Sequence, residues 1–346
     1  MLDRSLSMSL DKSMHRVVIT DCLEPPVKIE ETALAGLARL DCLMAKSTDE
    51  LVGKLGNADG IILYHEVTLT NDILSELKQC KVIVRGGVGY DNVDIQAAGA
   101  LGIPVCNVPD YGVDEVADHA IGMMLACMRG FVIAERRLRN ATVLKPWDRH
   151  DVGPVQRLAD SNLGIIGCGR IGSATALRAK ALKMRVFVYD PYLRPGVDKV
   201  IGVERVSLET LLAESDAISL HMPLTEETRE LVNAAALAQM KPTACLINTA
   251  RGAVVDTTAL AEALKLRRIA GAGIDVLPSE PPHTDDPLIQ LWQANEDPPI
   301  NLMITPHTAY YSEAGLLEIR EKSSAEVARV LRGEKPWNLV NREWLK

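Results

Sequence analysis

Side chains that can bind an acid and move a proton stand just after apolar segments in the second half of the chain. Arg251 carries a planar guanidinium that can hold a carboxylate through two parallel hydrogen bonds. Asp275 and Glu280 lie in a loop stiffened by prolines, and His307 carries an imidazole that exchanges protons near neutral pH. These residues indicate carboxylate binding beside general acid–base catalysis. The alternatives are a surface ion pair for Arg251 and solvated positions for the two acids.

A glycine motif stands in the middle of the chain, where residues 163–172 read LGIIGCGRIG. Gly167 would permit a tight bend, Gly169 would let the backbone approach a pyrophosphate, and Gly172 would let a helix pack close to the strand. The pyrophosphate would then bind at the N-terminus of a helix expected over 173–182. Glycines can also mark a simple turn, but the strand before this motif and the acid after it predict a bound dinucleotide.

Asp190 is that acid, and it ends the next apolar segment. Its carboxylate can accept hydrogen bonds from the hydroxyls of an adenosine ribose and would repel a 2′-phosphate. Asp190 therefore favours NAD over NADP, whereas Arg194 nearby is the residue that would accommodate the phosphate.

Apolar segments alternate with helical ones along the chain, which indicates an α/β fold. Two sets of strands are expected, and the second, with six strands, matches a complete Rossmann sheet. The sequence thus predicts two Rossmann-like, doubly wound parallel-sheet domains with an active-site cleft between them. The expected strands cover 17–20, 60–63, 82–85 and 105–108, then 163–166, 185–189, 217–220, 244–248, 271–274 and 302–304.

Composition excludes several classes of function. The net charge of −8 comes without a basic block, so direct nucleic-acid binding is not expected. No segment reaches the roughly 18 apolar residues of a membrane span. Seven scattered cysteines without a C-x-x-C pair predict reduced, buried thiols in a cytoplasmic protein.

Two further histidines are not expected to bind a metal. His119 is interpreted as a structural histidine and His65 as a loop residue. Since no metal-ligand spacing is present, no metal is expected.

A long, largely apolar helix is expected over 117–140, and an irregular arm that carries Trp147 follows over 142–160. An exposed tryptophan on such an arm is a candidate subunit contact. Residues 1–14 are polar and are expected to form a disordered tail. A further helix over 313–331 would return the chain to the first domain.

At these residues the chain resembles the D-isomer-specific 2-hydroxyacid dehydrogenase family. The loop over 84–94, VRGGVGYDNVD, is similar to that family's substrate-domain loop, and 167–172 is similar to its nucleotide turn. The resemblance implies a flavodoxin-like substrate (catalytic) domain over 15–109 plus 311–346. It also implies an NAD-binding Rossmann domain over 110–310, and a homodimer formed through the long helix and the arm.

The resemblance also implies roles for individual residues. Arg251 would bind the substrate carboxylate and polarise the carbonyl, His307 would exchange the proton, and Glu280 would pair with His307. The cofactor would be NAD, lined by Ile166, Gly167, Gly169, Arg170, Ile171, Gly172, Asp190, His221, Met222, Pro223, Thr249, Ala250 and Asp275.

The backbone N–H groups of Val88 and Gly89 would complete the carboxylate site. Arg85, Tyr64 and Tyr310 would also line the substrate. The alternative for Arg85 is a structural pair with a nearby acid.

Within the family, segments such as Tyr64-His65 and 189–193, YDPYL, resemble the C-terminal-binding-protein branch of NAD-linked corepressors. Two differences shift the expectation toward a metabolic enzyme. Tyr310 stands where animal members have tryptophan, and the sequence ends at Lys346 without their long tail. The expected function is that of an NAD-dependent dehydrogenase of a small 2-hydroxy acid, or 2-oxoacid reductase. The alternative is an NAD(H)-sensing corepressor or binding protein of this branch.

Overall fold

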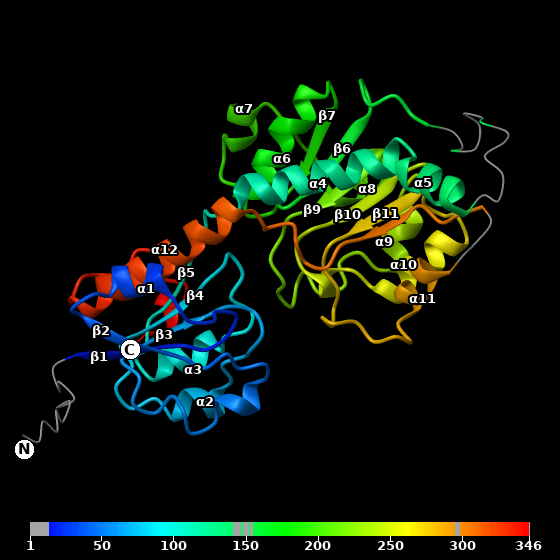
Figure 1. The fold of residues 1–346 in the computed structure, drawn as a ribbon. Coiled ribbons are helices and arrows are strands. Elements are labelled where there is room, and N and C mark those ends of the chain that lie inside the picture. Colours follow the sequence, from blue (N-terminus) through cyan, green and yellow to red (C-terminus); the bar gives the residue numbers. More distant parts are fainter. Residues whose placement is uncertain (1–13, 141–146, 148–151, 153–154, 295–297, 346) are drawn as a thin grey trace, which may run out of the picture. The chain divides into compact units, whose positions relative to one another are not determined.

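The computed structural model describes residues 14–140, 147, 152, 155–294 and 298–345 (Figure 1). The chain divides into two compact units, which we call unit 1, Met1–Tyr111 with Glu313–Lys346, and unit 2, Gly112–Ser312. These boundaries fall two residues beyond the expected crossings at 109 and 311. The expected tail lies outside the described residues except for Met14.

Unit 1 is built on a parallel sheet with the strand order β2-β1-β3-β4-β5, the order of flavodoxin-like sheets. Its core is formed by buried aliphatic side chains such as Ile61, Leu63 and Ile83. The strand β2 was not expected, because its sequence ARLDC places charged side chains on a half-exposed edge. The strands are β1 (His15–Ile19), β2 (Ala38–Cys42), β3 (Gly60–Leu63), β4 (Val82–Arg85) and β5 (Val105–Asn107); the α-helices are α1 (Lys28–Ala33), α2 (Asn71–Ser75), α3 (Ile95–Ala100) and α12 (Glu313–Leu331).

Unit 2 has a seven-stranded parallel sheet in the described residues, with the order β12-β11-β10-β9-β6-β7-β8. The order in which the chain adds strands to the sheet reverses between β6 and β9. Doubly wound folds bind their ligands at this place. The two-residue strand β8 was not expected, because it is too short to show a pattern. The strands are β6 (Asn162–Ile166), β7 (Arg185–Tyr189), β8 (Glu204–Arg205), β9 (Ala217–Leu220), β10 (Cys245–Asn248), β11 (Gly271–Ile274) and β12 (Leu302–Ile304).

The helices of unit 2 cover both faces of its sheet (Figure 1). Alternate residues of one strand serve the two faces: Ile247 packs with the buried side of α4 and α6, whereas Leu246 packs with the helices of the other face. Both side chains are fully buried, as expected for a sheet covered on both sides. The helices are α4 (Val113–Met128), α5 (Phe131–Asn140), α6 (Arg170–Ala181), α7 (Val197–Ile201), α8 (Leu208–Glu214), α9 (Ala234–Gln239), α10 (Thr257–Lys265) and α11 (Pro287–Gln293).

The prediction of one long helix over 117–140 is wrong. Two helices, α4 and α5, meet at an angle of 63°. Gly130 lies at the break with a φ of +69°, a left-handed conformation that ends a helix and suits glycine. The apolar pattern continues across the break, so periodicity alone does not reveal it. The helix after the glycine motif begins at Arg170, three residues before the expected start.

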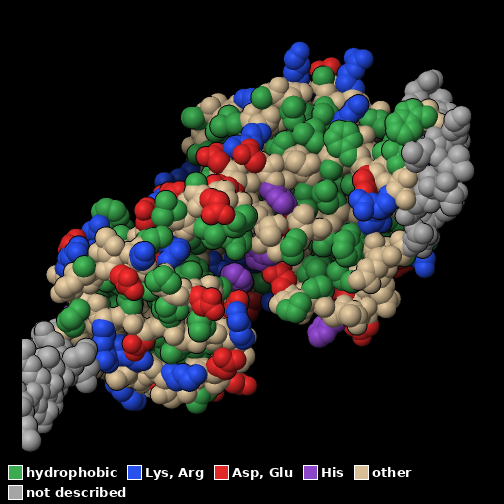
Figure 2. Space-filling view, in the orientation of Figure 1, with side chains coloured by type: hydrophobic (Ala, Val, Ile, Leu, Met, Phe, Trp, Pro, Cys, Tyr) green, Lys and Arg blue, Asp and Glu red, His purple; other side chains and the backbone are tan. Residues whose placement is uncertain are grey.

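Charged side chains of both signs are intermixed over the visible face of each unit (Figure 2). Among the described residues, no single helix is long and apolar enough to cross a membrane, and α4 with α5 reach that length and composition only as a bent pair. None of the seven cysteines forms a disulfide, and four of them are buried. Cys22, Cys42 and Cys80 are only partly buried, which corrects the expectation for these three.

Candidate active site

The glycine-rich turn joins β6 to α6, and steric contacts explain two of its glycines. Gly167 has a φ of +89°, and a Cβ there would lie 2.8 Å from the backbone of His221 and Met222. A Cβ on Gly172 would lie 2.1 Å from the carbonyl oxygen of Gly167 and would push α6 away from the turn. Apart from Gly169 and its two neighbours in the chain, no described residue has an atom within 4 Å of the Cβ position of Gly169, so the space above it is open. The turn therefore has the shape that admits a pyrophosphate at a helix N-terminus.

Asp190 follows β7 and is joined directly to the glycine-rich turn. Its Oδ2 accepts a hydrogen bond from the N–H of Cys168 over 2.8 Å, and its Oδ1 accepts one from the N–H of Tyr192 over 2.9 Å. Arg205 of β8 donates from Nη2 to the carbonyl oxygen of Asp190 over 3.1 Å. A cation that the sequence had not pointed to thus lies at this strand end.

The turn after β9 carries His221, Met222 and Pro223. The N–H of His221 donates to the carbonyl oxygen of Ile166 over 2.8 Å, which places this turn beside the glycines. Its Nε2 lies 2.8 Å from the hydroxyl of Ser219. Burial lowers the pKa of His221 to about 4, so its imidazole is neutral at pH 7.

Two buried polar atoms at this edge of the sheet have no hydrogen-bond partner among the described residues: Nδ1 of His221 and Oγ1 of Thr249. Buried polar atoms in native proteins are normally paired, so unpaired ones indicate a polar ligand. Together with the open space above Gly169, they fit a bound dinucleotide.

Arg251 stands in a short loop after β10 that one side chain organises. The Oδ1 of Asn248 accepts from the N–H of Ala250 over 3.0 Å, and its Nδ2 donates to the carbonyl oxygen of Arg251 over 3.0 Å. The next residue, Gly252, packs against the following loop, because a Cβ there would lie 1.9 Å from the backbone of Leu277. The loops after β10 and β11 are therefore in contact.

Asp275 follows β11, and its side chain is 1% exposed, so a solvated position is wrong for this acid. Oδ1 accepts hydrogen bonds from Oγ1 of Thr305 over 2.5 Å and from the N–H of Thr308 over 2.9 Å, and Oδ2 accepts one from the N–H of Ala309 over 3.0 Å. His119 of α4 approaches from the other side, with Nε2 3.0 Å from Oγ1 of Thr305 and 3.6 Å from Oδ1. This carboxylate fixes the loop that carries His307; a contact with the cofactor stays a prediction.

Glu280 and His307 form a hydrogen-bonded pair, with Nδ1 of His307 2.6 Å from Oε2 of Glu280. The other carboxylate oxygen accepts from the N–H of Leu277 over 2.8 Å. Burial acts to raise the pKa of Glu280, but the hydrogen bond from His307 and the nearby charges of His307 and Arg251 lower it below its ordinary value of 4.5. The acid is therefore ionised at neutral pH and paired, not simply solvated.

His307 has a φ of +52°, which is uncommon for a residue with a side chain. Its N–H donates to the carbonyl oxygen of Asp275 over 2.8 Å, and this bond helps to hold the strained backbone. The ring of Tyr310 stands edge-on to the His307 ring, with 6.1 Å between the centroids. The structure thus brings Tyr310 next to the imidazole.

In unit 1, Arg85 ends β4, and its side chain folds back over its own loop. Its Nη1 donates to the carbonyl oxygen of Gly86 over 3.1 Å, and its Nε lies 3.4 Å from Oδ1 of Asn92. A Cβ on Gly87 would fall 1.3 Å from Nη1, so only glycine leaves room for the guanidinium. Val88 and Gly89 follow, both half-buried.

Tyr64 lies against the same loop, since a Cβ on Gly86 would come within 2.6 Å of its ring. Its buried hydroxyl has no hydrogen-bond partner among the described residues. Burial and the charge of Glu30 raise the pKa of Tyr64, so the phenol is neutral.

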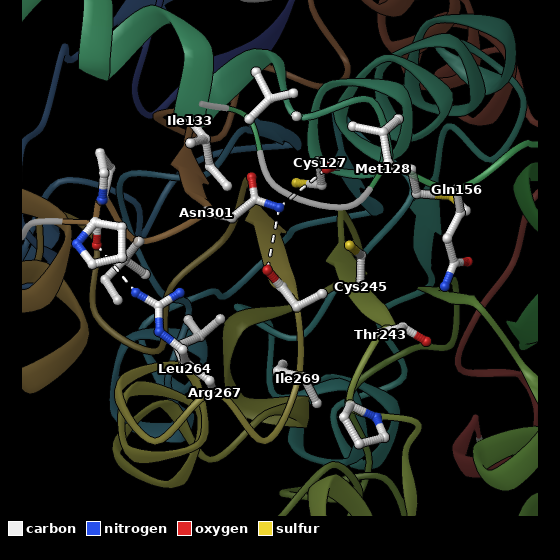
Figure 3. Close-up of a pocket in the computed structure, with 18 of the residues that line it drawn as sticks. Cys127, Met128, Ile133, Gln156, Thr243, Cys245, Leu264, Arg267, Ile269 and Asn301 are labelled. Atoms are coloured by element: carbon white, nitrogen blue, oxygen red, sulfur yellow. Dashed lines mark hydrogen bonds between the residues drawn. The ribbon is translucent and has the colours of Figure 1, made fainter. Parts of the chain in front are cut away.

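A cavity of about 360 Å³ lies at the opposite edge of the unit 2 sheet (Figure 3). Its walls include Cys245, the first residue of β10, and Asn301, which precedes β12. Asn301 donates to the carbonyl oxygens of Cys127 and Ala270, so its amide closes part of the wall. None of the residues predicted for catalysis or cofactor binding lines this cavity.

Sequence reasoning missed three contributors to the site: Thr305, Asn248 and Arg205. Thr305 acts through a contact with Asp275, which follows a separate strand, and a linear pattern does not show it. Asn248 acts through hydrogen bonds inside its own loop. Arg205 lies on the unexpected strand β8. His119 was expected to be a satisfied structural histidine, and its bond to Thr305 confirms this.

The fold and the strand-end chemistry of unit 2 define a dinucleotide-binding α/β protein with an acid–base pair. Residues 121–309 match the family model for the NAD binding domain of D-isomer specific 2-hydroxyacid dehydrogenases. The chain belongs to the D-isomer specific 2-hydroxyacid dehydrogenase family. It is an NAD-dependent oxidoreductase that acts on a CH–OH group.

Relatives and solved structures agree with this assignment. The chain is 37% identical to a glyoxylate reductase of Korarchaeum cryptofilum over 86% of each chain. It is 36% identical to a D-3-phosphoglycerate dehydrogenase of Methanocaldococcus jannaschii over 95% of this chain, but it spans only 60% of that relative. Among solved structures, D-lactate dehydrogenase of Aquifex aeolicus, complexed with NAD and lactic acid, is 32% identical with a TM-score of 0.82. That match covers 92% of this chain and 96% of the other.

Proposed function

We propose that this protein reduces a small 2-oxoacid with NADH and, in reverse, oxidises the D-2-hydroxy acid. The pairing of His307 with Glu280 carries the proposal. It places a proton-exchanging group after β12, while Arg251 follows β10 at the same carboxyl edge of the sheet. The glycine-rich turn after β6 is also at that edge.

The chain's own residues supply the proton and the electrostatics. Because the ionised carboxylate of Glu280 only accepts, Nδ1 of His307 carries a hydrogen, and Nε2 is the nitrogen that exchanges a proton with the substrate oxygen. In reduction, His307 gives this proton to the forming hydroxyl. Arg251 binds the carboxylate and stabilises the negative charge that develops on the carbonyl oxygen. When bound, NADH supplies the hydride.

The residues assigned to the cofactor hold it in separate ways. Asp190 would accept from the adenosine ribose hydroxyls. Oγ1 of Thr249 and Nδ1 of His221, which have no hydrogen-bond partner among the described residues, would bond to polar groups of the cofactor. The other residues assigned to the cofactor are Ile166, Gly167, Gly169, Arg170, Ile171, Gly172, Met222, Pro223, Ala250 and Asp275.

For the substrate, we assign carboxylate binding in unit 1 to Arg85 and to the backbone N–H groups of Val88 and Gly89. Tyr310 and Tyr64 would contact the rest of the acid. Arg85→Ala tests this assignment: a raised KM for every 2-oxoacid at unchanged NADH affinity supports it. Unaltered kinetics would make Arg85 a structural residue.

A screen of 2-oxoacids tests the function as a whole. Glyoxylate, pyruvate and 3-phosphohydroxypyruvate, chosen from the named activities of the relatives, are each supplied with NADH while the loss of its absorbance is followed. We expect turnover with at least one acid, and turnover lower by about 10²–10⁴-fold with the His307→Asn variant. NADH binding without turnover of any 2-oxoacid would contradict the proposal.

NADH binding without turnover of any 2-oxoacid is the outcome expected of an NAD(H)-sensing protein like the C-terminal-binding-protein branch. The motifs Tyr64-His65 and 189–193 favour this alternative. The complete set of Arg251, Glu280 and His307 favours the enzyme, because a binding protein has no chemical need for all three.

We propose in addition a homodimer formed through α5 and the segment around Trp147. Phe131 and Trp147 are 60% and 75% exposed, and a partner that covered them would remove this apolar surface from water. Most of the expected arm, residues 141–146, 148–151 and 153–154, lies outside the described residues. Light scattering at micromolar concentration should give twice the mass of the chain. A monomer that persists there would end this proposal.

We also place the protein in the cytoplasm, because its unpaired cysteines suit a reducing compartment. Cell fractionation with an antibody against the chain should find it in the cytoplasmic fraction. Recovery from an oxidising compartment would contradict this location.

A further inference from the structure

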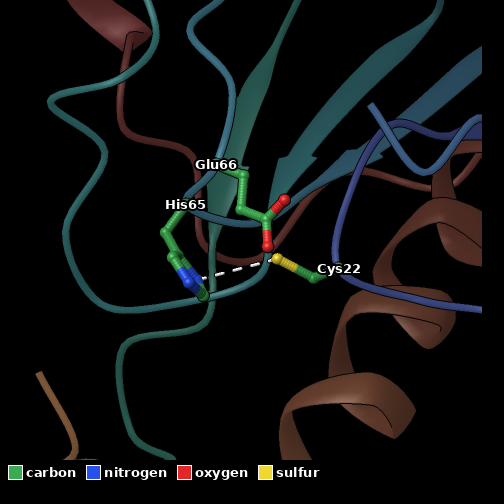
Figure 4. A group of neighbouring side chains, drawn as sticks. All are labelled: Cys22, His65 and Glu66. Atoms are coloured by element: carbon green, nitrogen blue, oxygen red, sulfur yellow. Dashed lines mark hydrogen bonds between the residues drawn. The ribbon is translucent and has the colours of Figure 1, made fainter. Parts of the chain in front are cut away.

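Three side chains with metal-binding atoms meet in unit 1, apart from the residues assigned to the reaction (Figure 4). Cys22 lies just beyond the carboxyl end of β1, and His65 and Glu66 lie just beyond that of β3. These two strands are neighbours in the parallel sheet, so their ends meet at one edge. The Sγ of Cys22, a ring nitrogen of His65 and a carboxylate oxygen of Glu66 all lie within 4.8 Å of one another.

The spacing of these atoms suits zinc. Bonds of about 2.3 Å to sulfur and about 2.0 Å to nitrogen around a tetrahedral ion put the two ligand atoms roughly 3.5 Å apart. The Sγ of Cys22 lies 3.8 Å from Nδ1 of His65, so a small rotation of either side chain reaches this separation. Thiolate, imidazole and carboxylate together favour Zn²⁺ over Mg²⁺ or Ca²⁺, which prefer oxygen ligands alone.

We propose that Cys22, His65 and Glu66 form a three-ligand binding site for Zn²⁺, with the remaining coordination position open to water. In zinc sites, three protein ligands and one open position are typical of an accessible ion, whereas four protein ligands are typical of a closed structural ion.

The surrounding charges support a cation at this place. Asp21 is fully buried, and its Oδ2 lies 3.4 Å from the Sγ of Cys22. Zinc binds the thiolate, so the metal must displace the proton of the Cys22 thiol. The ion would then offset the negative charges of the thiolate, of Glu66 and of Asp21. This attraction favours the exchange.

The segment that carries two of the ligands is already fixed by the protein. Asp21 accepts from the N–H groups of Tyr64 and Glu66, each over 2.8 Å. Asn92 donates to the carbonyl oxygens of Tyr64 and Val67, over 2.9 Å and 2.8 Å. His65 and Glu66 therefore stand on a pre-organised backbone, which lowers the entropy cost of binding an ion.

Lys46 competes with the metal for Glu66, because its Nζ lies 2.8 Å and 3.1 Å from the two carboxylate oxygens. This contact can be used to test whether Glu66 binds the metal. Lys46→Met removes the competing ammonium while retaining most of the side chain, so it should tighten zinc binding. Unchanged or weaker zinc binding in this variant would contradict a role for Glu66 as a ligand.

The experiment is a titration of the full chain with Zn²⁺ against a fluorescent zinc indicator, repeated with Co²⁺ in a spectrophotometer. We expect one ion per chain, with a thiolate-to-cobalt charge-transfer band in the near ultraviolet. Cys22→Ser should abolish that band, and Cys22→Ser and His65→Ala should each weaken zinc binding at least 10-fold. All these positions are in loops, and circular dichroism checks that each variant is folded.

Cys42→Ser is the matched control, because Cys42 is another partly buried thiol of unit 1 and is not in the cluster. It should leave both titrations unchanged. The proposal is overturned if Cys22→Ser keeps the wild-type zinc affinity and the cobalt band, or if Cys42→Ser is the variant that loses them. Zinc bound without any thiolate band would overturn it as well.

Discussion

The two edges of the unit 2 sheet are made from the same strands and have opposite characters. At the carboxyl edge, β10 leads to Arg251, β11 to Asp275 and β12 to His307, and the carboxylate of Asp275 bonds to the loop that carries His307. At the amino edge, the same strands begin at a cavity with largely apolar walls (Figure 3). Parallel strands place all their ends of one kind together, so the chemistry gathers on one side only. The volume of a cavity is therefore a poor guide to the reaction here.

The largest effect expected at the carboxyl edge is that of His307→Asn. Asparagine tolerates the left-handed backbone of this position, so the loop should keep its conformation. Turnover should fall by about 10²–10⁴-fold, as for the loss of a general acid or base. Steady-state kinetics measure the loss, and fluorescence titration should show nearly unchanged NADH affinity. Full turnover would mean that the proton comes from another group.

Asp190→Ala tests cofactor choice at the same edge. The native protein should bind NADH more tightly than NADPH, and the variant should bind NADH roughly 10-fold more weakly, because charge-assisted hydrogen bonds to the ribose are lost. Binding titrations with both cofactors measure the gap, and Asp190→Asn, which keeps one acceptor, should give an intermediate value. Equal affinities of the native protein for both cofactors would contradict the assignment.

A substitution at the amino edge should have the opposite signature. Ile269 lines the cavity and is 2% exposed. Ile269→Val should lower the free energy of unfolding by about 0.5–1.5 kcal/mol, since a buried methylene is removed. Urea denaturation measures this change, while kcat should stay at the wild-type value. A large fall in kcat would contradict the functional separation of the two edges.

The smallest expected effect is on the pH dependence of stability, through Glu280. Its folded-state pKa is lowered, so the unfolded chain binds more protons and the pair stabilises the fold above pH 4.5. This stability is lost as the pH falls through the lowered pKa of the folded state. The difference in Tm between the native protein and Glu280→Gln should therefore shrink from pH 7 toward pH 3. A difference that grows on acidification would be the wrong sign.

Strong apolar patterns allowed much of the fold to be predicted. The observed bounds of β3, β4, β7, β9, β11, β12 and α12 are those expected from the sequence. What could not be predicted has physical reasons: β2 mixes charged and apolar residues, β8 is too short for a period, and the break at Gly130 interrupts no apolar pattern.

The site also has a part that could be predicted from the sequence and a part that could not. Side chains that follow strands directly, such as Arg251 and His307, could be selected from their types and positions. Their supports could not, because Asp275 joins β11 to the loop after β12, and Thr305 joins that loop to α4. These bonds arise only when separate strands and helices pack together.

The bonds at Asp275 have a consequence for motion. The N–H groups of Thr308 and Ala309 end on a fully enclosed carboxylate, so the loop of His307 is ordered by the protein before any ligand arrives. The entropy cost of fixing this loop is therefore met during folding, and cofactor binding need not supply it. Amide hydrogen exchange at these two positions should be as slow as in the core strands, and nearly the same with and without NADH.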